Sequence, residues 1–169
     1  MSVKRSLFSG FVRGLFSSSV DVELESTGPV LAAKGKKVLV VDDDPIFQKI
    51  ISQKLKDKGY KVINAIDASE AIAAMREEKP DAVVLDINFP PDISNGVGVP
   101  WDGIRLMTWI RQVEGRAQIP MFIVTSDDIR LYEAKAAECG AKGVFFKALD
   151  QKRLVNMVNR VLDQKSMAA

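Results

Sequence analysis

The sequence predicts an α/β protein built on a five-stranded, doubly wound parallel sheet. Two observations lead to this fold class: short apolar runs recur along the chain, and a helix-like segment follows each of them. Apolar runs of this length are typical of strands that are covered on both faces. Strands that alternate with helices in series indicate parallel β–α–β units, with helices on both sides of one sheet.

The first strand ends in an acidic run. Residues 38–41 are apolar, and Asp42, Asp43 and Asp44 follow them directly. Three adjacent carboxylates repel one another, so a cation, solvent or helix N-termini must offset that cost, and oxygen ligands favour hard ions such as Mg²⁺. The alternative is a solvated acidic turn in which Asp42 or Asp44 caps the helix that begins at Pro45.

The remaining elements continue the alternation of strands and helices. A helix at 45–58 follows the first strand, and Gly59 ends it. The later strands and helices are expected, in chain order, at 60–66, 68–78, 81–87, 102–113, 119–124, 128–139 and 144–146, and in a last helix capped by Asp150. We therefore expect one domain at 37–163, preceded by a segment and linker at 1–36 and followed by a tail at 164–169.

Composition excludes several classes of function. The chain has 169 residues, of which 47% are hydrophobic, and this is enough for one domain with a real core. Its formal charge of +2 lies in residues 1–36, which leaves a neutral body and argues against a nucleic-acid-binding surface. The absence of histidine excludes histidine-based catalysis, most zinc sites and a phosphohistidine on this chain.

The cysteine content and the hydropathy pattern suggest where the protein works. Cys139 is the only cysteine, so an intrachain disulfide is impossible, and the residue is expected to fill a small gap in the core. No apolar run approaches the ~18 residues of a membrane span. We expect a cytoplasmic protein.

Residues 1–20 form a distinct basic segment. They contain no acidic residue, and their apolar residues recur at helical spacing among lysine and arginine. This pattern favours a short amphipathic helix that binds a membrane surface or a partner's groove. Packing against the body of the protein and disorder remain the alternatives.

Polar residues follow four of the predicted strands at their carboxyl ends. In a parallel sheet these ends meet at one edge, where ligands bind. The residues concerned are Asp42, Asp43, Asp44, Asp86, Thr125, Ser126 and Lys147. A carboxylate nucleophile, an acidic Mg²⁺ site, a hydroxyl and an ammonium are the groups needed to move a phosphoryl group onto an aspartate.

Four short motifs carry a resemblance to a known family. In chain order they are Val40-Val41-Asp42-Asp43, Val84-Leu85-Asp86, Val124-Thr125-Ser126 and Phe146-Lys147. Their order and spacing resemble the signatures of the receiver domain of two-component response regulators, over about residues 37–163. The resemblance implies the flavodoxin-like receiver fold.

The resemblance also implies a role for each acidic residue. Asp86 would accept a phosphoryl group from the phosphohistidine of a sensor histidine kinase or a phosphotransfer protein. Asp42, Asp43 and Asp86, together with the backbone carbonyl of Asn88, would ligate the cofactor Mg²⁺. Such an oxygen-only set suits Mg²⁺, which keeps several of its waters.

Two further residues complete the site that the resemblance implies. Thr125 would bond a phosphoryl oxygen, and Lys147 would pair with the acyl phosphate. Alternatively, Thr125 is an ordinary strand residue and Lys147 a solvated lysine. Asn88 and Asp127 resemble positions that tune autodephosphorylation in the family, although plain loop polarity explains them equally well.

The sequence departs from the family pattern in three places. An insertion at about 91–101 separates Phe89-Pro90 from Asp102-Gly103, and it is either a lid or partner-contact loop or a tolerated surface insertion. Ala148 stands where the family has a proline in a cis peptide. Val144 stands where the family often has a switching aromatic residue, so the output surface is expected to work differently.

We expect a stand-alone receiver that signals by docking to another protein and is not an enzyme beyond its own phosphorylation and dephosphorylation. The docking surface would be the face of the fourth helix, fifth strand and fifth helix, which also offers a homodimer interface. One alternative is a phosphorylation-independent scaffold of receiver shape. The other is a Mg²⁺-dependent phosphatase of the haloacid-dehalogenase type, in which the nucleophile's strand normally comes first.

Overall fold

The computed structural model describes residues 35–88, 102–113 and 118–167. The basic segment 1–20 and the insertion 91–101 lie outside these ranges, so the expectations for them remain predictions. Within the described ranges, no helix is both long enough and apolar enough to cross a membrane.

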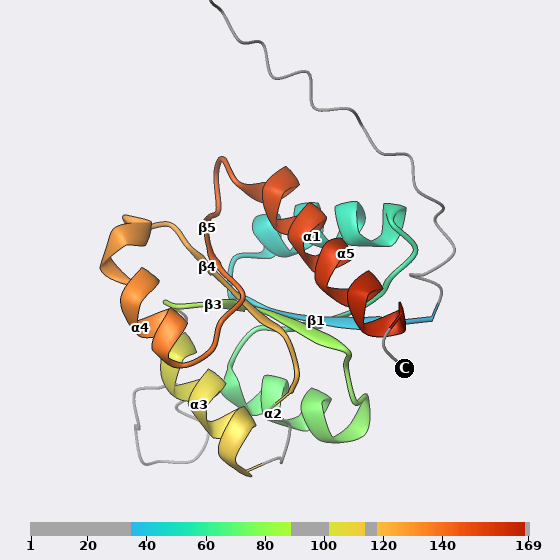
Figure 1. Cartoon of the computed structure of the whole chain (residues 1–169), viewed down its shortest axis with the longest axis horizontal. Helices are drawn as coiled ribbons and strands as arrows, with labels where there is room; N and C mark the ends of the chain where they lie inside the picture. The colour runs from blue at the N-terminus through green and yellow to red at the C-terminus, as the bar shows by residue number, and fades with distance from the viewer. Residues whose placement is uncertain (1–34, 89–101, 114–117, 168–169) are drawn as a thin grey trace, which may run out of the picture.

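The described residues form one parallel sheet of five strands (Figure 1). The strand order is β2-β1-β3-β4-β5, and every neighbouring pair is parallel. The strands are β1 (Lys37–Val41), β2 (Lys61–Ala65), β3 (Ala82–Asp86), β4 (Met121–Thr125) and β5 (Val144–Phe146). The predicted sheet is confirmed, and its order reverses direction between β1 and β3, where a ligand site is expected.

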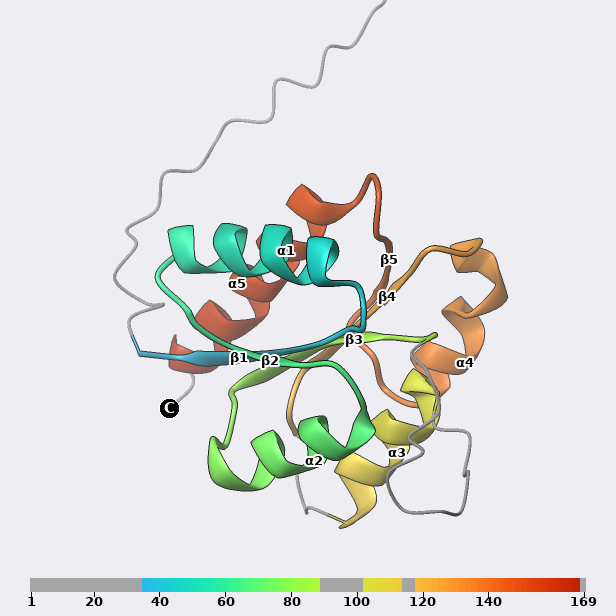
Figure 2. The same ribbon diagram turned by 180° about the vertical axis from the view of Figure 1, so that it is seen from behind.

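Helices cover both faces of the sheet. Helices α1 and α5 lie on one face, whereas α2, α3 and α4 lie on the other (Figures 1 and 2). The helices are α1 (Pro45–Asp57), α2 (Ala68–Glu77), α3 (Gly103–Val113), α4 (Glu133–Glu138) and α5 (Gln151–Met167), and a short 3₁₀ helix, η1 (Ile129–Leu131), precedes α4.

The alternation of side chains along each central strand explains this layering. Leu39 and Val41 of β1 belong to the core under α2 and α3, whereas Val38 and Val40 belong to the core under α1 and α5. Successive residues of a strand point to opposite faces, so an unbroken apolar run must be covered twice. The strands β3 and β4 follow the same rule.

The expected helix at 128–139 is wrong as a single element. The side chain of Asp128 accepts a hydrogen bond from the backbone N–H of Arg130 and begins η1. Tyr132, with φ of −118°, separates η1 from the six-residue α4. The local side-chain cap therefore favours a short 3₁₀ turn over a continuous helix.

The last helix also differs from its expected bounds. It continues to Met167, whereas the sequence places its end near residue 163. The carboxylate of Asp150 accepts a hydrogen bond from the backbone N–H of Phe146 at 2.9 Å, and the Asp150 carbonyl accepts one from Leu154 at 2.8 Å. Asp150 thereby fixes the turn between β5 and α5.

Helix α3 begins in close contact with the end of β3. The backbone N–H of Gly103 donates to the carbonyl of Ile87 at 2.9 Å. A Cβ atom at Gly103 would lie 2.2 Å from the backbone oxygen of Asp86, closer than any real contact. Only glycine therefore permits α3 to start at this place, next to Asp86.

We predict that Gly103→Ala lowers the free energy of unfolding by roughly 1–3 kcal/mol, because the added methyl group must displace the backbone of β3. Gly143→Ala is the matched control, since its methyl group would meet only the ring of Phe145, at 3.1 Å. Urea unfolding of both variants measures the difference. Equal free energies of unfolding for the two variants would contradict the prediction that the backbone of β3 leaves no room for a Cβ atom at residue 103.

Candidate functional site

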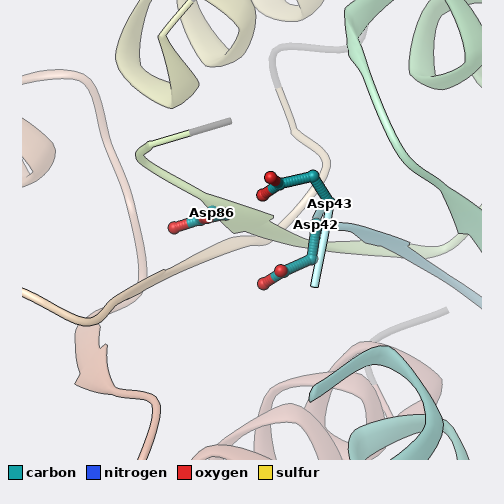
Figure 3. Close-up of side chains that lie close together, drawn as sticks. All are labelled: Asp42, Asp43 and Asp86. Carbon is teal, nitrogen blue, oxygen red and sulfur yellow. The ribbon is translucent and has the colours of Figure 1, made fainter. Parts of the chain in front are cut away.

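Three aspartates converge at the carboxyl edge of the sheet. Asp42 and Asp43 follow β1, and Asp86 ends β3, the next strand in the sheet. Their carboxylates each provide an oxygen within 4.8 Å of the others (Figure 3). Asp42 and Asp86 are buried, whereas Asp43 is exposed. The parallel order thus brings together acids that lie far apart in the sequence.

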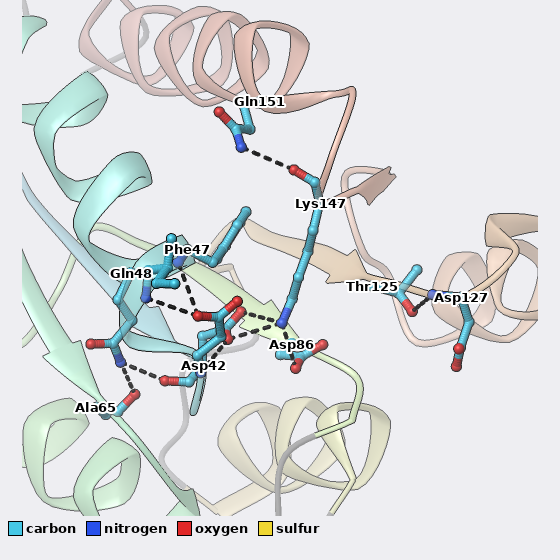
Figure 4. A network of polar contacts seen from close by, with 11 residues as sticks. Asp42, Phe47, Gln48, Ala65, Asp86, Thr125, Asp127, Lys147 and Gln151 are labelled. Carbon is cyan, nitrogen blue, oxygen red and sulfur yellow. Dashed lines mark hydrogen bonds and ion pairs between the residues drawn. The ribbon is translucent and has the colours of Figure 1, made fainter.

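Lys147 reaches this cluster from the end of β5. Its ammonium donates to Asp42 Oδ1 at 2.9 Å and to Asp86 Oδ2 at 2.8 Å (Figure 4). The lysine side chain is only 11% exposed. Its Nζ also lies 5.2 Å from the centre of the Phe47 ring, close enough for a cation–π contact. One ammonium therefore bridges two buried carboxylates.

The backbone around Asp42 is held from both sides. The N–H of Asp42 donates to the carbonyl of Ala65 at 3.0 Å, and the side-chain amide of Gln48 donates to the Asp42 and Ala65 carbonyls at 2.5 and 2.8 Å. Asp44 caps helix α1: its Oδ1 accepts hydrogen bonds from the backbone N–H groups of Ile46 and Phe47. The helix-cap alternative thus describes Asp44.

Thr125 lies at the end of β4, beside the acidic cluster. Asp86, the last residue of β3, is in register with Val124, so Thr125 lies one residue beyond the end of β3. Its buried hydroxyl accepts from the backbone N–H of Asp127 at 3.0 Å. Its carbonyl accepts from the backbone N–H of Lys147 at 2.9 Å. This bond to β4 fixes the backbone of Lys147, although the next residue is Ala148 and not the proline of the family pattern.

A second polar group lies next to Thr125. The Asp127 Oδ2 atom accepts from the side-chain amide of Asn88 at 2.6 Å and from the hydroxyl of Tyr132 at 2.8 Å. The structure thus joins the two residues that resemble tuning positions. Tyr132 is not among the site residues predicted from the sequence. The one signal that could have indicated it is that no other aromatic residue lies between Phe122 and Phe145.

Burial controls the protonation of the cluster. It raises the pKa of Asp42 from 3.8 to about 6, and it also raises the pKa of Asp86, although the bonds from Lys147 oppose both shifts. Burial alone lowers the pKa of Lys147, but its bonds to Asp42 and Asp86 outweigh this and raise it. The raised pKa of Lys147 keeps its ammonium protonated, whereas the raised pKa values of Asp42 and Asp86 make loss of their protons less favourable.

The cluster fits a magnesium ion. Three carboxylates face one ammonium, and the buried Asp86 Oδ1 has no hydrogen-bond partner among the described residues. A group of carboxylate oxygens with surplus negative charge suits a hard divalent cation. For Asn88, the structure provides the amide contact with Asp127, and its carbonyl as a ligand remains a prediction.

We predict that Asp42→Asn stabilises the protein by about 1–2 kcal/mol at neutral pH in the absence of Mg²⁺, because the amide removes a buried charge. The folded wild type binds a proton at Asp42 more readily than the unfolded chain does, so its stability rises as pH falls from 7 through about 6 towards 4. The advantage of the amide variant over the wild type should therefore shrink over this range. Urea unfolding at several pH values tests this, and a destabilised variant at pH 7 would contradict it.

Known structures share this fold, which is that of CheY-like receiver domains. A CheY-like receiver domain from Methanospirillum hungatei superposes with a TM-score of 0.66 at 22% identity, covering 79% of this chain and 98% of that one. Chemotaxis protein CheY4 of Vibrio cholerae gives a TM-score of 0.63 at 25% identity, covering 75% of this chain and 98% of that one.

The chain belongs to the response regulator receiver domain family, whose model matches residues 38–159. It is 30% identical over 134 residues to PhoP of Bacillus subtilis, an alkaline phosphatase synthesis transcriptional regulatory protein, covering 79% of this chain and 51% of PhoP. It is 29% identical over 129 residues to PilH of Pseudomonas aeruginosa, covering 75% of this chain and 97% of PilH. The chain thus spans about half the length of PhoP and nearly all of PilH.

The expected family and fold are confirmed. The protein contains a receiver domain of two-component signalling, and phosphorylation and magnesium are typical of its family.

Proposed function

We propose that Asp86 is the phosphoacceptor of this receiver domain. The observation that carries the proposal is the position of its carboxylate: Oδ2 accepts from Lys147, the buried Oδ1 makes no side-chain hydrogen bond among the described residues, and the backbone N–H of Asn88 lowers the pKa of the same carboxyl. An oxygen in this state is free to act as a nucleophile, and the held oxygen orients it. The sequence contains no histidine, so the phosphohistidine that would donate the phosphoryl group lies outside these residues.

The proposed step is an in-line phosphoryl transfer. The N–P bond of the donor phosphohistidine breaks while a bond forms between phosphorus and a carboxylate oxygen of Asp86. The donor nitrogen leaves with the electron pair and takes a proton from water. Thr125 donates its hydroxyl to one phosphoryl oxygen, and the Lys147 ammonium moves from the carboxylates to the acyl phosphate.

Charge balance requires a cation in the site. Asp42, Asp43, Asp86 and the carbonyl of Asn88 would hold Mg²⁺, which when bound neutralises negative charge on the phosphoryl group. Lys147 supplies one positive charge, which leaves the three acids and an incoming phosphoryl group with a large negative excess. The described residues can therefore supply acceptor, hydroxyl and ammonium, with the metal as cofactor.

The proposed partners are a sensor histidine kinase or phosphotransfer protein and a downstream target protein. The target would dock on α4, β5 and α5, where the structure has an open groove of about 310 Å³ between residues such as Ala137, Val144 and Met157. The same face would serve a homodimer. A cytoplasmic location, with residues 1–20 binding a membrane surface or a partner, completes the proposal.

We predict that the full chain gains the mass of one phosphoryl group when treated with acetyl phosphate and Mg²⁺, because acetyl phosphate is an activated donor small enough to reach Asp86. Asp86→Asn should abolish the gain, and chelation of Mg²⁺ with EDTA should suppress it at least tenfold. Intact-mass spectrometry measures both effects.

Asp81→Asn is the matched control for this experiment, because Asp81 lies at the opposite end of β3 and accepts from the Lys37 N–H at 2.7 Å. It should gain the phosphoryl group as the wild type does. A gain that persists in Asp86→Asn would overturn the assigned acceptor. A wild type that gains nothing would favour the scaffold, and repeated turnover of small phosphoesters would favour the phosphatase.

A further inference from the structure

Asp127 is the centre of a small hydrogen-bonded group that extends away from the acceptor. Its backbone N–H donates to the hydroxyl of Thr125 at 3.0 Å, while its carboxylate accepts from Asn88 at 2.6 Å and from Tyr132 at 2.8 Å. Asn88 follows β3 and Thr125 ends β4, so both belong to the edge that carries Asp86. Tyr132 belongs to the segment between η1 and α4.

The hydroxyl of Tyr132 donates a hydrogen bond to Asp127 and makes none with helix α4. Tyr132 is the N-cap residue of α4, yet its side chain makes no capping bond. Its half-buried ring packs against the core on the α2, α3 and α4 face of the sheet, while its hydroxyl reaches Asp127. The ring is thus anchored in the core and the hydroxyl touches the site.

The elements next to Tyr132 are suited to movement. Helix η1 has three residues and α4 has six, so each has fewer internal backbone hydrogen bonds than the longer helices of the protein. Helix η1 also lies against β5, the strand that begins at Val144, where the sequence lacks the aromatic residue that the family often has. A small shift at Tyr132 would therefore be passed to the α4 and β5 face.

We infer that Tyr132 is a positioning residue that acts through Asp127 and couples the phosphorylation state of Asp86 to the η1–α4 segment. This inference rests on the proposed function of Asp86. If the Thr125 side chain rotates towards a phosphoryl oxygen on Asp86, its hydroxyl leaves the N–H of Asp127. The Asp127 loop then shifts, and the bond from Tyr132 to its carboxylate breaks.

The coupling works in both directions. If phosphorylation of Asp86 breaks the Tyr132 bond, then removal of the Tyr132 hydroxyl favours the phosphorylated state, because that state no longer costs the bond. Tyr132→Phe should therefore gain the phosphoryl group more readily than the wild type, by about two- to tenfold, which is the range expected for one lost hydrogen bond. Asp127→Ala should have a similar effect, and the double variant should show little more than either single variant.

The test uses the fact that the chain has two tyrosines, Tyr60 and Tyr132. The full chain is labelled with 3-fluorotyrosine, and its fluorine NMR spectrum is recorded before and after treatment with acetyl phosphate and Mg²⁺, with the intact mass measured on the same sample. Tyr60→Phe and Tyr132→Phe assign the two signals. Tyr60, whose hydroxyl donates to Asn159 Oδ1 at 2.9 Å on the opposite face of the sheet, is the internal control.

We expect the Tyr132 signal to shift on phosphorylation and the Tyr60 signal to stay in place. Tyr60→Phe should leave the extent of phosphorylation unchanged, whereas Tyr132→Phe should raise it. A mass gain without movement of the Tyr132 signal, or equal phosphorylation of the two variants, would overturn the coupling and leave the acceptor assignment intact. Absence of any mass gain would overturn both.

Discussion

The candidate site is organised around one buried interaction, in which the ammonium of Lys147 lies between the carboxylates of Asp42 and Asp86. Each acid alone would be costly to bury as an anion, and burial does raise both of their pKa values. The lysine supplies a compensating charge and fixes the direction of Asp86 Oδ2. Oδ1 of the same carboxylate has no hydrogen-bond partner in the described residues. This oxygen therefore remains available to a metal ion or a phosphoryl group.

The parallel sheet supplies the geometry that this interaction needs. β1, β3 and β5 contribute the two acids and the lysine, and β4 lies between β3 and β5. The backbone bond from Lys147 to Thr125 and the side-chain bond from Gln151 to the Lys147 carbonyl, at 3.1 Å, hold the lysine's loop on both sides. The loop therefore has several supports although Ala148 replaces the usual proline. On the other side of Asp86, Gly103 allows the backbone of α3 to approach without a gap.

Much of the fold could be predicted from the sequence because the physical signals were strong. The apolar runs at β1, β3 and β4 require cover on both faces, and the acids and the hydroxyl begin where these runs end. The split between η1 and α4 could not be predicted from periodicity, because it depends on the local cap at Asp128. The role of Tyr132 could not be predicted for a related reason: it lies at this break between η1 and α4, and its bond to Asp127 is a contact of the folded loop that periodicity does not reveal.

The most direct test of this account is the Mg²⁺ affinity of the unphosphorylated protein, measured by isothermal titration calorimetry for the wild type and for Lys147→Met. The ammonium lies 2.7 and 2.8 Å from oxygens of the proposed metal ligands Asp42 and Asp86, so it repels a cation and competes for the same carboxylates. We expect Lys147→Met to bind Mg²⁺ about tenfold or more tightly than the wild type, with one ion per chain. Unchanged or weaker binding in a folded variant would contradict it.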